Sequence, residues 1–183
     1  MEIDKILDDN LILNDLKAES KIQVLEKLSK VLKENEYISE VDGFVKDVLE
    51  REKLGVTGIG NFVAIPHGQS DYVNETTIAI GKLNKEIEWE SLDNNGVRIV
   101  ILFVVKNDKN FADEHLKLLS KVASNLANED ILKKLLSADS KEEIKIVLGV
   151  RDENSWCLCV CCWYSSYIFS ERKVNKCSLQ KRT

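Results

Sequence analysis

One segment constrains the fold of this chain more than any other. Residues 97–105 read VRIVILFVV, with a single charged residue among nine. A strand with apolar side chains on both of its faces is stable only inside a sheet that is covered on both sides. We therefore expect a central strand with neighbours at its edges and helices above and below the sheet.

The flanking sequence alternates between helical and strand patterns. Ser20 is a helix N-cap, followed by an apolar stripe of Ile22, Leu25, Leu28, Val31 and Leu32. Ser39 and Asp42 resemble a capping box for a second helix. We further expect strands at 11–13, 62–65 and 76–83, helices at 113–127, 130–137 and 140–148, and a turn at Asn94-Asn95-Gly96. The fold class predicted is α/β, a small mixed β-sheet flanked by helices on both faces.

Residues 51–68, REKLGVTGIGNFVAIPHG, are the most informative for function. They hold four of the eight glycines, the only proline and one of two histidines. Pro66 has no N–H for a sheet, so we expect strand pairing to stop there or the strand to reach a sheet edge. His67 then lies at a strand end in a tight turn, and Gly68 allows a ligand or the backbone to approach closely.

An imidazole in such a turn transfers protons, binds a metal or acts as a nucleophile. The segment offers His67 no cysteine or second histidine, which argues against a metal site. Proton transfer and covalent catalysis remain, beside the alternative of a turn histidine with no role. The glycines, the proline and Arg51 favour a function.

These residues resemble a known family. Arg51-Glu52, Thr57-Gly58-Ile59-Gly60 and Ala64-Ile65-Pro66-His67-Gly68 occur in the order and at the separations of the enzyme IIA domains of the bacterial phosphotransferase system, fructose/mannitol type. The resemblance covers about residues 5–148. It implies a phosphotransferase that works through a phosphohistidine.

The resemblance also implies the partners and the site residues. His67 accepts a phosphoryl group from the histidine-containing phosphocarrier protein HPr and passes it to a cysteine of a IIB domain, which serves a membrane IIC permease. His115, in the sequence EHLKLLSKVA, matches an auxiliary histidine, and Arg51 matches an arginine that stabilises the phosphate.

Elementary chemistry agrees with this assignment and leaves alternatives open. A phosphoryl group needs hydrogen-bond donors, which a guanidinium and the amides of a glycine loop (Thr57, Gly58, Gly60 and Gly68) supply. His115 has helical spacing to Leu118 and Leu119, so it equally suits the rim of an apolar helix face. Arg51 equally suits a helix C-terminus, where it interacts with the helix dipole.

Composition excludes several function classes. Residues 1–150 carry 20 basic and 28 acidic side chains, which argues against nucleic-acid binding. No secretory signal and no apolar run of membrane-spanning length is present, and the cysteines lie only after residue 150. We expect a cytoplasmic protein with no cofactor, no metal and no direct membrane insertion.

Residues 149–183 break every pattern of the preceding domain, residues 1–148. They contain all five cysteines and two of the three tryptophans, with no ordinary zinc spacing. Read one base later, the codons of Trp156-Cys157 and Trp163-Tyr164 both yield glycine. With allowed codons elsewhere, the segment then resembles the start of a fructose-type IIB domain, a cysteine before Gly-Ile-Ala-His-Thr. We interpret it as a frameshifted translation and expect disorder.

Two function classes follow for the chain. The first is a phosphocarrier in sugar uptake, fructose-family on the evidence of the IIB-like segment. The second is a regulatory IIA protein of the nitrogen type, which signals through its phosphorylation state by protein binding. A third reading, an inert fragment, applies if truncation has removed the acceptor.

Overall fold

The central strand predicted from the sequence is present in the computed structural model, which describes residues 7–107, 126 and 128–148. It is β6, Val97–Lys106. From Ile99 to Val105, odd-numbered side chains enter one buried cluster and even-numbered side chains enter another. Both faces of β6 are therefore covered, as its apolar sequence requires.

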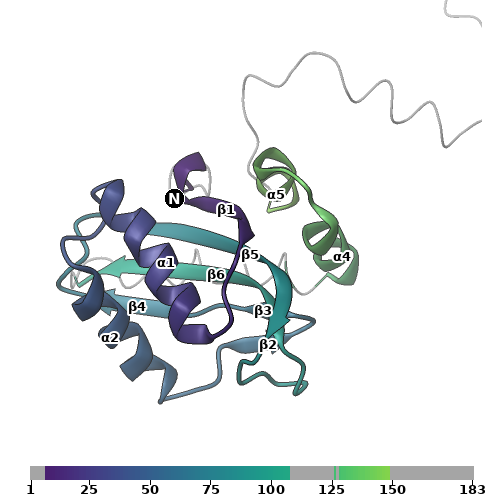
Figure 1. Cartoon of the computed structure of the whole chain (residues 1–183), viewed down its shortest axis with the longest axis horizontal. Coiled ribbons are helices and arrows are strands. Elements are labelled where there is room, and N and C mark those ends of the chain that lie inside the picture. The colour runs from purple at the N-terminus through teal and green to yellow at the C-terminus, as the bar shows by residue number, and fades with distance from the viewer. Residues whose placement is uncertain (1–6, 108–125, 127, 149–183) are drawn as a thin grey trace, which may run out of the picture. The chain divides into compact units, whose positions relative to one another are not determined.

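Six strands form one mixed sheet (Figure 1). Their bounds are β1 Ile12–Leu16, β2 Gly58–Gly60, β3 Val63–Ala64, β4 His67–Ser70, β5 Thr77–Ile87 and β6. The order is β1-β5-β6-β3-β2, and β4 also pairs with β6. β5 is antiparallel to β6 and β2 to β3, whereas β1 is parallel to β5, and β3 and β4 are parallel to β6.

Helices cover each face of the sheet. α1, Lys21–Glu34, and α2, Val41–Glu52, lie side by side (Figure 1) and join the cluster that we call the α1–α2 cluster, which contains Leu28, Phe44 and Val48. α4, Glu129–Ser137, and α5, Lys141–Val147, join the α4–α5 cluster, which contains Leu126 and Ile144. The predicted α/β class, with helices on both faces of a small mixed sheet, is confirmed.

Local sequence signals explain most helix starts. The Ser20 side chain accepts a hydrogen bond from the Gln23 amide at the start of α1, as predicted. Ser140 does the same for the Glu143 amide in α5. Each cap satisfies a backbone donor that has no partner within the helix. One member of the predicted α1 stripe is wrong, because Ile22 is 50% exposed and Val24 is buried instead.

The capping box predicted at Ser39 and Asp42 is also wrong. The N-cap of α2 is Glu40, whose carboxylate accepts from the Asp42 and Gly43 amides. The Ser39 amide and hydroxyl both donate to the Tyr72 carbonyl, at 2.8 Å and 3.1 Å. A contact between distant segments thus occupies Ser39 and leaves the longer side chain of Glu40 to cap the helix.

Several boundaries also differ from the sequence prediction. Leu11 ends a short 3₁₀ helix, Asp9–Leu11, and the first strand starts one residue later. Strand β5 continues to Ile87. The helix predicted at 113–127 lies outside the described residues except for Leu126, and the segment 149–183 lies wholly outside them. The domain boundary at 148/149 therefore stays a prediction.

Candidate functional site

His67 is the first residue of β4, so it lies at a strand end as expected, but in a strand and not in a tight turn. Pairing continues past Pro66 on β4, which is an edge strand in the described part of the chain, in agreement with the second of the two alternatives. β3 and β4 both pair with β6, one on each side of Pro66. Pro66 lacks an N–H, but its carbonyl accepts from the Phe103 amide at 2.9 Å. Because this carbonyl still accepts a hydrogen bond from β6, the strand is interrupted only at Ile65 and Pro66, and the sheet continues beyond them.

The His67 ring is fixed by one backbone hydrogen bond. Its Nδ1 lies 2.8 Å from the Ile65 carbonyl oxygen. A carbonyl oxygen can only accept, so Nδ1 carries the proton, and in the neutral ring Nε2 is the nitrogen with the lone pair. The side chain is half-buried. A nucleophilic nitrogen is thus available on a ring whose orientation is set by the backbone.

The register places His67 and Gly68 on opposite faces of the sheet. His67 pairs with Phe103, which belongs to the α4–α5 cluster, and Gly68 pairs with Val104 of the α1–α2 cluster. A Cβ added to Gly68 would meet Val48 Cγ2 at 2.5 Å. The close approach expected at Gly68 is therefore made by side chains of α2.

The glycine segment forms a hairpin beside His67. Gly58 and Gly60 belong to β2, which pairs antiparallel with β3. Thr57 is buried, and its carbonyl accepts from the Ile65 amide at 2.9 Å. The Thr57 hydroxyl accepts from Trp89 Nε1 at 3.3 Å. A continuous set of hydrogen bonds thus runs from Trp89 through Thr57 and Ile65 to the His67 ring.

The turn of this hairpin is tied to the connection between β5 and β6. Asp93 accepts from the Asn61 amide at 2.9 Å, and the Leu92 amide donates to the Gly58 carbonyl at 3.0 Å. The backbone amides of Asn61 and Asn95 lower the pKa of the Asp93 carboxyl to about 2. The assignment of Thr57 and the three glycines to phosphate binding stays a prediction.

In the described part of the chain, we find no hydrogen bond between Arg51 and His67. Arg51 is exposed in the last turn of α2, the helix that covers the Gly68 face. Its role in phosphate binding stays a prediction, as does its interaction with the helix dipole. His115 lies outside the described residues.

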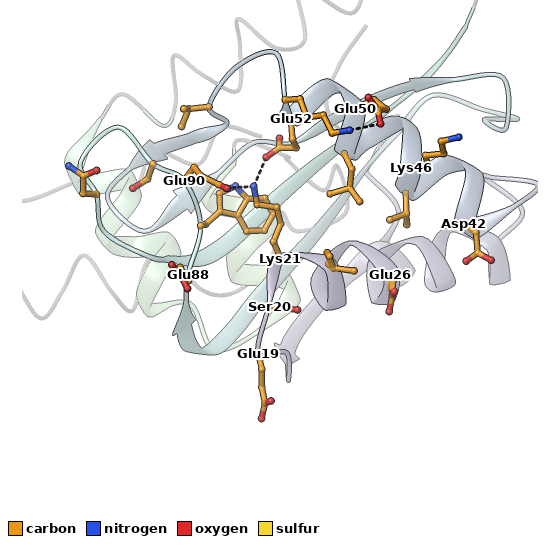
Figure 2. A pocket seen from close by; sticks show the side chains of 18 residues that line it. Glu19, Ser20, Lys21, Glu26, Asp42, Lys46, Glu50, Glu52, Glu88 and Glu90 are labelled. Carbon is orange, nitrogen blue, oxygen red and sulfur yellow. Dashed lines mark hydrogen bonds and ion pairs between the residues drawn. The ribbon is translucent and has the colours of Figure 1, made fainter.

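An acidic groove of about 1250 Å³ lies between α1, α2 and the segment that follows β5 (Figure 2). Lys21 is its central cation. Its Nζ contacts Glu52 Oε2 at 3.2 Å and the Glu90 carboxylate, and it lies 5.0 Å from the centre of the Trp89 ring. The hydrogen bond from Lys21 lowers the pKa of Glu90. His67 does not line this groove. The contacts of Lys21 with Trp89 and Glu90 instead hold the segment after β5, and Trp89 donates to the Thr57 hydroxyl.

The described residues show neither a metal cluster nor a membrane span. Within residues 7–107, 126 and 128–148, His, Cys, Asp and Glu side chains form no group of three suited to a metal ion. In that same part of the chain, we find no helix with the length and apolar content needed to cross a bilayer.

Trp89 and Asp93 were not singled out from the sequence. Asp93 adjoins the Asn94-Asn95-Gly96 segment, which the sequence marked only as a turn. The turn lies slightly earlier than predicted, at Leu92 and Asp93, and Asn94 is a bend with φ 57°. An aspartate in such a turn is common as a local cap, so its bond to a residue 32 positions away left no local signal.

Comparison with known proteins shows the family to which most of this chain belongs. The family model described as "Phosphoenolpyruvate-dependent sugar phosphotransferase system, EIIA 2" matches residues 5–149. A nitrogen regulatory protein of Bradyrhizobium diazoefficiens is 34% identical over 82% of this chain and 96% of its own length. The fructose-specific EIIABC component of Bacillus subtilis is 28% identical over 84% of this chain, which spans only 24% of that relative.

Solved structures give the same result for the fold. The nitrogen regulatory protein IIA-Ntr of Neisseria meningitidis aligns with a TM-score of 0.72 and 30% identity, covering 80% of this chain and 98% of that one. Enzyme IIA mannitol of Escherichia coli, solved in complex with phosphorylated enzyme IIB mannitol, aligns with a TM-score of 0.66 at 21% identity over 80% and 100%. The chain therefore belongs to the EIIA 2 family of the phosphoenolpyruvate-dependent sugar phosphotransferase system.

Proposed function

We propose that this chain carries a phosphoryl group on His67, attached through Nε2. The observation that carries the proposal is the 2.8 Å hydrogen bond from His67 Nδ1 to the Ile65 carbonyl. It holds the ring in one tautomer and directs the lone pair of Nε2 away from the strand. A half-buried ring at the start of β4 is accessible to a partner protein and restricted in orientation.

The transfer step needs little covalent chemistry from the protein. The Nε2 lone pair of His67 forms a bond to phosphorus, the bond from phosphorus to the donor's ring nitrogen breaks, and its electron pair returns to that ring. Nδ1 keeps its proton, and the Ile65 carbonyl stabilises the positive charge that the phosphorylated ring acquires. In the second step a cysteine thiolate attacks phosphorus and His67 leaves as the neutral imidazole. The resemblance identifies HPr as the donor and a IIB domain as the acceptor.

His115 is proposed as an auxiliary residue that assists without being stably phosphorylated. Leu126, at the end of the helix predicted for 113–127, is buried in the α4–α5 cluster, and Phe103 in the register position beside His67 belongs to the same cluster. A helix on that face is on the correct side of the sheet to present a histidine to His67.

Arg51 is proposed as a phosphate-stabilising residue with a smaller effect. The helix α2 covers the opposite face, so its guanidinium must extend around β4 to contact a phosphoryl group on His67. In the described part of the chain β4 pairs only with β6, so its outer edge is open to such an approach. Arg51→Gln should therefore slow transfer less than His115→Ala.

We propose that the chain acts in the cytoplasm and that its phosphoryl group serves the uptake of a sugar of the fructose family through a IIC permease. The IIB-like reading of residues 149–183 supports it. A specific observation favours a second candidate, a regulatory protein of the nitrogen type. The nitrogen regulatory relative is 34% identical to this chain, whereas the fructose-specific EIIABC component is 28% identical.

Two assays test these proposals. The chain is incubated with phosphoenolpyruvate, enzyme I and HPr, and its intact mass is measured. One added phosphate that is lost in acid, and absent in His67→Ala, supports the phosphocarrier role; labelling that persists in His67→Ala refutes it. The labelled chain is then mixed with a purified fructose-type IIB domain. Transfer to the IIB cysteine supports sugar uptake, whereas failure of transfer favours the regulatory role.

A further inference from the structure

The turn of the β2–β3 hairpin has an unfavourable backbone conformation. Gly60, Asn61 and Phe62 have φ of 93°, 52° and 64°, so three successive residues lie in the left-handed region. L side chains disfavour this region, and Phe62 has neither the freedom of glycine nor the short polar side chain of asparagine. Such a turn persists only where its surroundings hold it.

The Asp93 carboxylate provides that hold. Asp93 Oδ2 accepts from the Asn61 amide at 2.9 Å and from Asn95 Nδ2 at 2.9 Å. Oδ1 accepts from the Asn95 amide at 3.1 Å and from Ser91 Oγ at 3.0 Å. A Cβ added to Gly60 would lie 3.1 Å from Asp93 Oδ2, so a glycine there also leaves space for the carboxylate.

The turn is directly connected to the histidine. The Phe62 carbonyl accepts from the Arg98 and Ile99 amides, and β3 follows at Val63–Ala64. The next residue, Ile65, supplies the carbonyl that holds His67 Nδ1. Because β3 is only two residues long and pairs with both β2 and β6, the turn and the Ile65 carbonyl belong to one short bonded segment, and a shift of the turn is transmitted to the carbonyl.

We propose that Asp93 is a positioning residue for phosphoryl transfer, which acts on His67 through the left-handed turn Gly60–Phe62 and the Ile65 carbonyl. The inference rests on the proposed function of His67. The Asp93 pKa of about 2 keeps this carboxylate ionised throughout the neutral range, so the carboxylate remains a hydrogen-bond acceptor at the pH of the assay. Asp93 touches neither the imidazole nor the donor in this role.

The test compares Asp93→Asn with Glu86→Gln in the full chain. Glu86 is a matched control, because its carboxylate accepts from the Gly96 amide at 2.9 Å on the same β5–β6 hairpin but does not contact the turn. In Asp93→Asn, an amide N–H replaces one acceptor and faces backbone donors. We expect phosphoryl transfer to His67 to slow by about 10- to 100-fold, and Glu86→Gln to transfer at the wild-type rate.

A spectroscopic measurement separates positioning from general stability. Nitrogen NMR of the histidine rings, with His67 assigned through His67→Ala, reports which ring nitrogen is protonated. The Nδ1–H form should dominate in the wild type and in Glu86→Gln, and it should lose that dominance in Asp93→Asn. Phe62→Gly, which relieves the left-handed strain at the residue least suited to it, should restore most of the rate and of the Nδ1–H signal when combined with Asp93→Asn.

Rates and spectra of Asp93→Asn that match those of Glu86→Gln would overturn the inference. If Asp93→Asn does not fold, Asp93→Glu takes its place, since it keeps the charge and displaces the carboxylate by one methylene, with the same expected direction. A wild-type chain that accepts no phosphate refutes the proposed function instead. The NMR comparison then decides alone whether Asp93 positions the His67 ring.

Discussion

Gly68→Ala should destabilise the fold although it only adds a methyl group. The new Cβ would lie 2.5 Å from Val48 Cγ2 and 2.9 Å from Phe44 Cε2. Both neighbours are fully buried, at 0% exposure, and belong to the core between α2 and the sheet. Because neither side chain has free space to move into, either α2 must move away from β4 or the core must repack.

Two opposing effects set the change in the free energy of unfolding of Gly68→Ala. Gly68 does not have a positive φ, so alanine fits its backbone and gains about 0.4–1 kcal/mol by restricting the unfolded chain. Overpacking a close-packed core costs about 1–3 kcal/mol, and more where the backbone has to shift. The distance of 2.5 Å is far inside van der Waals contact, so we expect the clash to dominate and the net loss to be about 1–3 kcal/mol.

Urea unfolding followed by circular dichroism measures this loss. Gly55→Ala is the matched control, because the nearest atom to its added Cβ is an Arg51 guanidinium nitrogen at 3.9 Å. We expect that variant to stay within about 0.5 kcal/mol of the wild type. Val48→Ala removes the atom in closest contact, so combining it with Gly68→Ala should recover about 1 kcal/mol relative to the sum of the single changes.

The same variants distinguish packing from phosphate binding at Gly68. Equal stabilities of Gly68→Ala and Gly55→Ala would refute the packing argument. If Gly68→Ala kept its stability but accepted phosphate slowly, the predicted role of Gly68 in the phosphate loop would be favoured instead.

Four further predictions address the site and the tail. His67→Ala should take up no acid-labile phosphate, as intact mass will show, while keeping its midpoint of urea unfolding. His115→Ala should still label at His67 but about 10- to 1000-fold more slowly, and an unchanged rate would reduce His115 to a packing residue. The pKa of the Asp93 carboxyl is lowered from 3.8 to about 2, so the ionised carboxylate stabilises the fold fully above pH 4, and this stabilisation is lost as the pH falls towards 2. Acid unfolding of Asp93→Asn should therefore depend less steeply on pH between 4 and 2. An acid unfolding curve identical to that of the wild type would contradict the stabilising role of the Asp93 carboxylate. Removing residues 151–183 should leave the melting temperature and labelling unchanged, and the gene should show an open frame one base over that encodes the Gly-Ile-Ala-His-Thr sequence.

The sequence by itself determined the architecture and indicated the family. The apolar run at 97–105, rich in β-branched residues, predicts a central strand, and such a strand is removed from water only in a sheet covered on both faces. Ser20 marked a helix start because a cap acts within three residues. The Pro66-His67-Gly68 motif, with the glycine segment before it, pointed to the family that the comparison then showed. All of these signals are local in the chain.

Only the tertiary structure determined which side chains and backbone groups contact one another across the fold. Glu40 caps α2 because the Tyr72 carbonyl occupies Ser39, and Gly68 is required by the approach of Val48. The proline does not end pairing, because its carbonyl finds the Phe103 amide on a strand far along the chain. Asp93 reaches Asn61 across 32 residues because the β5–β6 connection lies beside the glycine hairpin. Helical and strand periodicities report only on neighbours within a few residues, so contacts set by strand register and helix packing leave no pattern that a single sequence reveals.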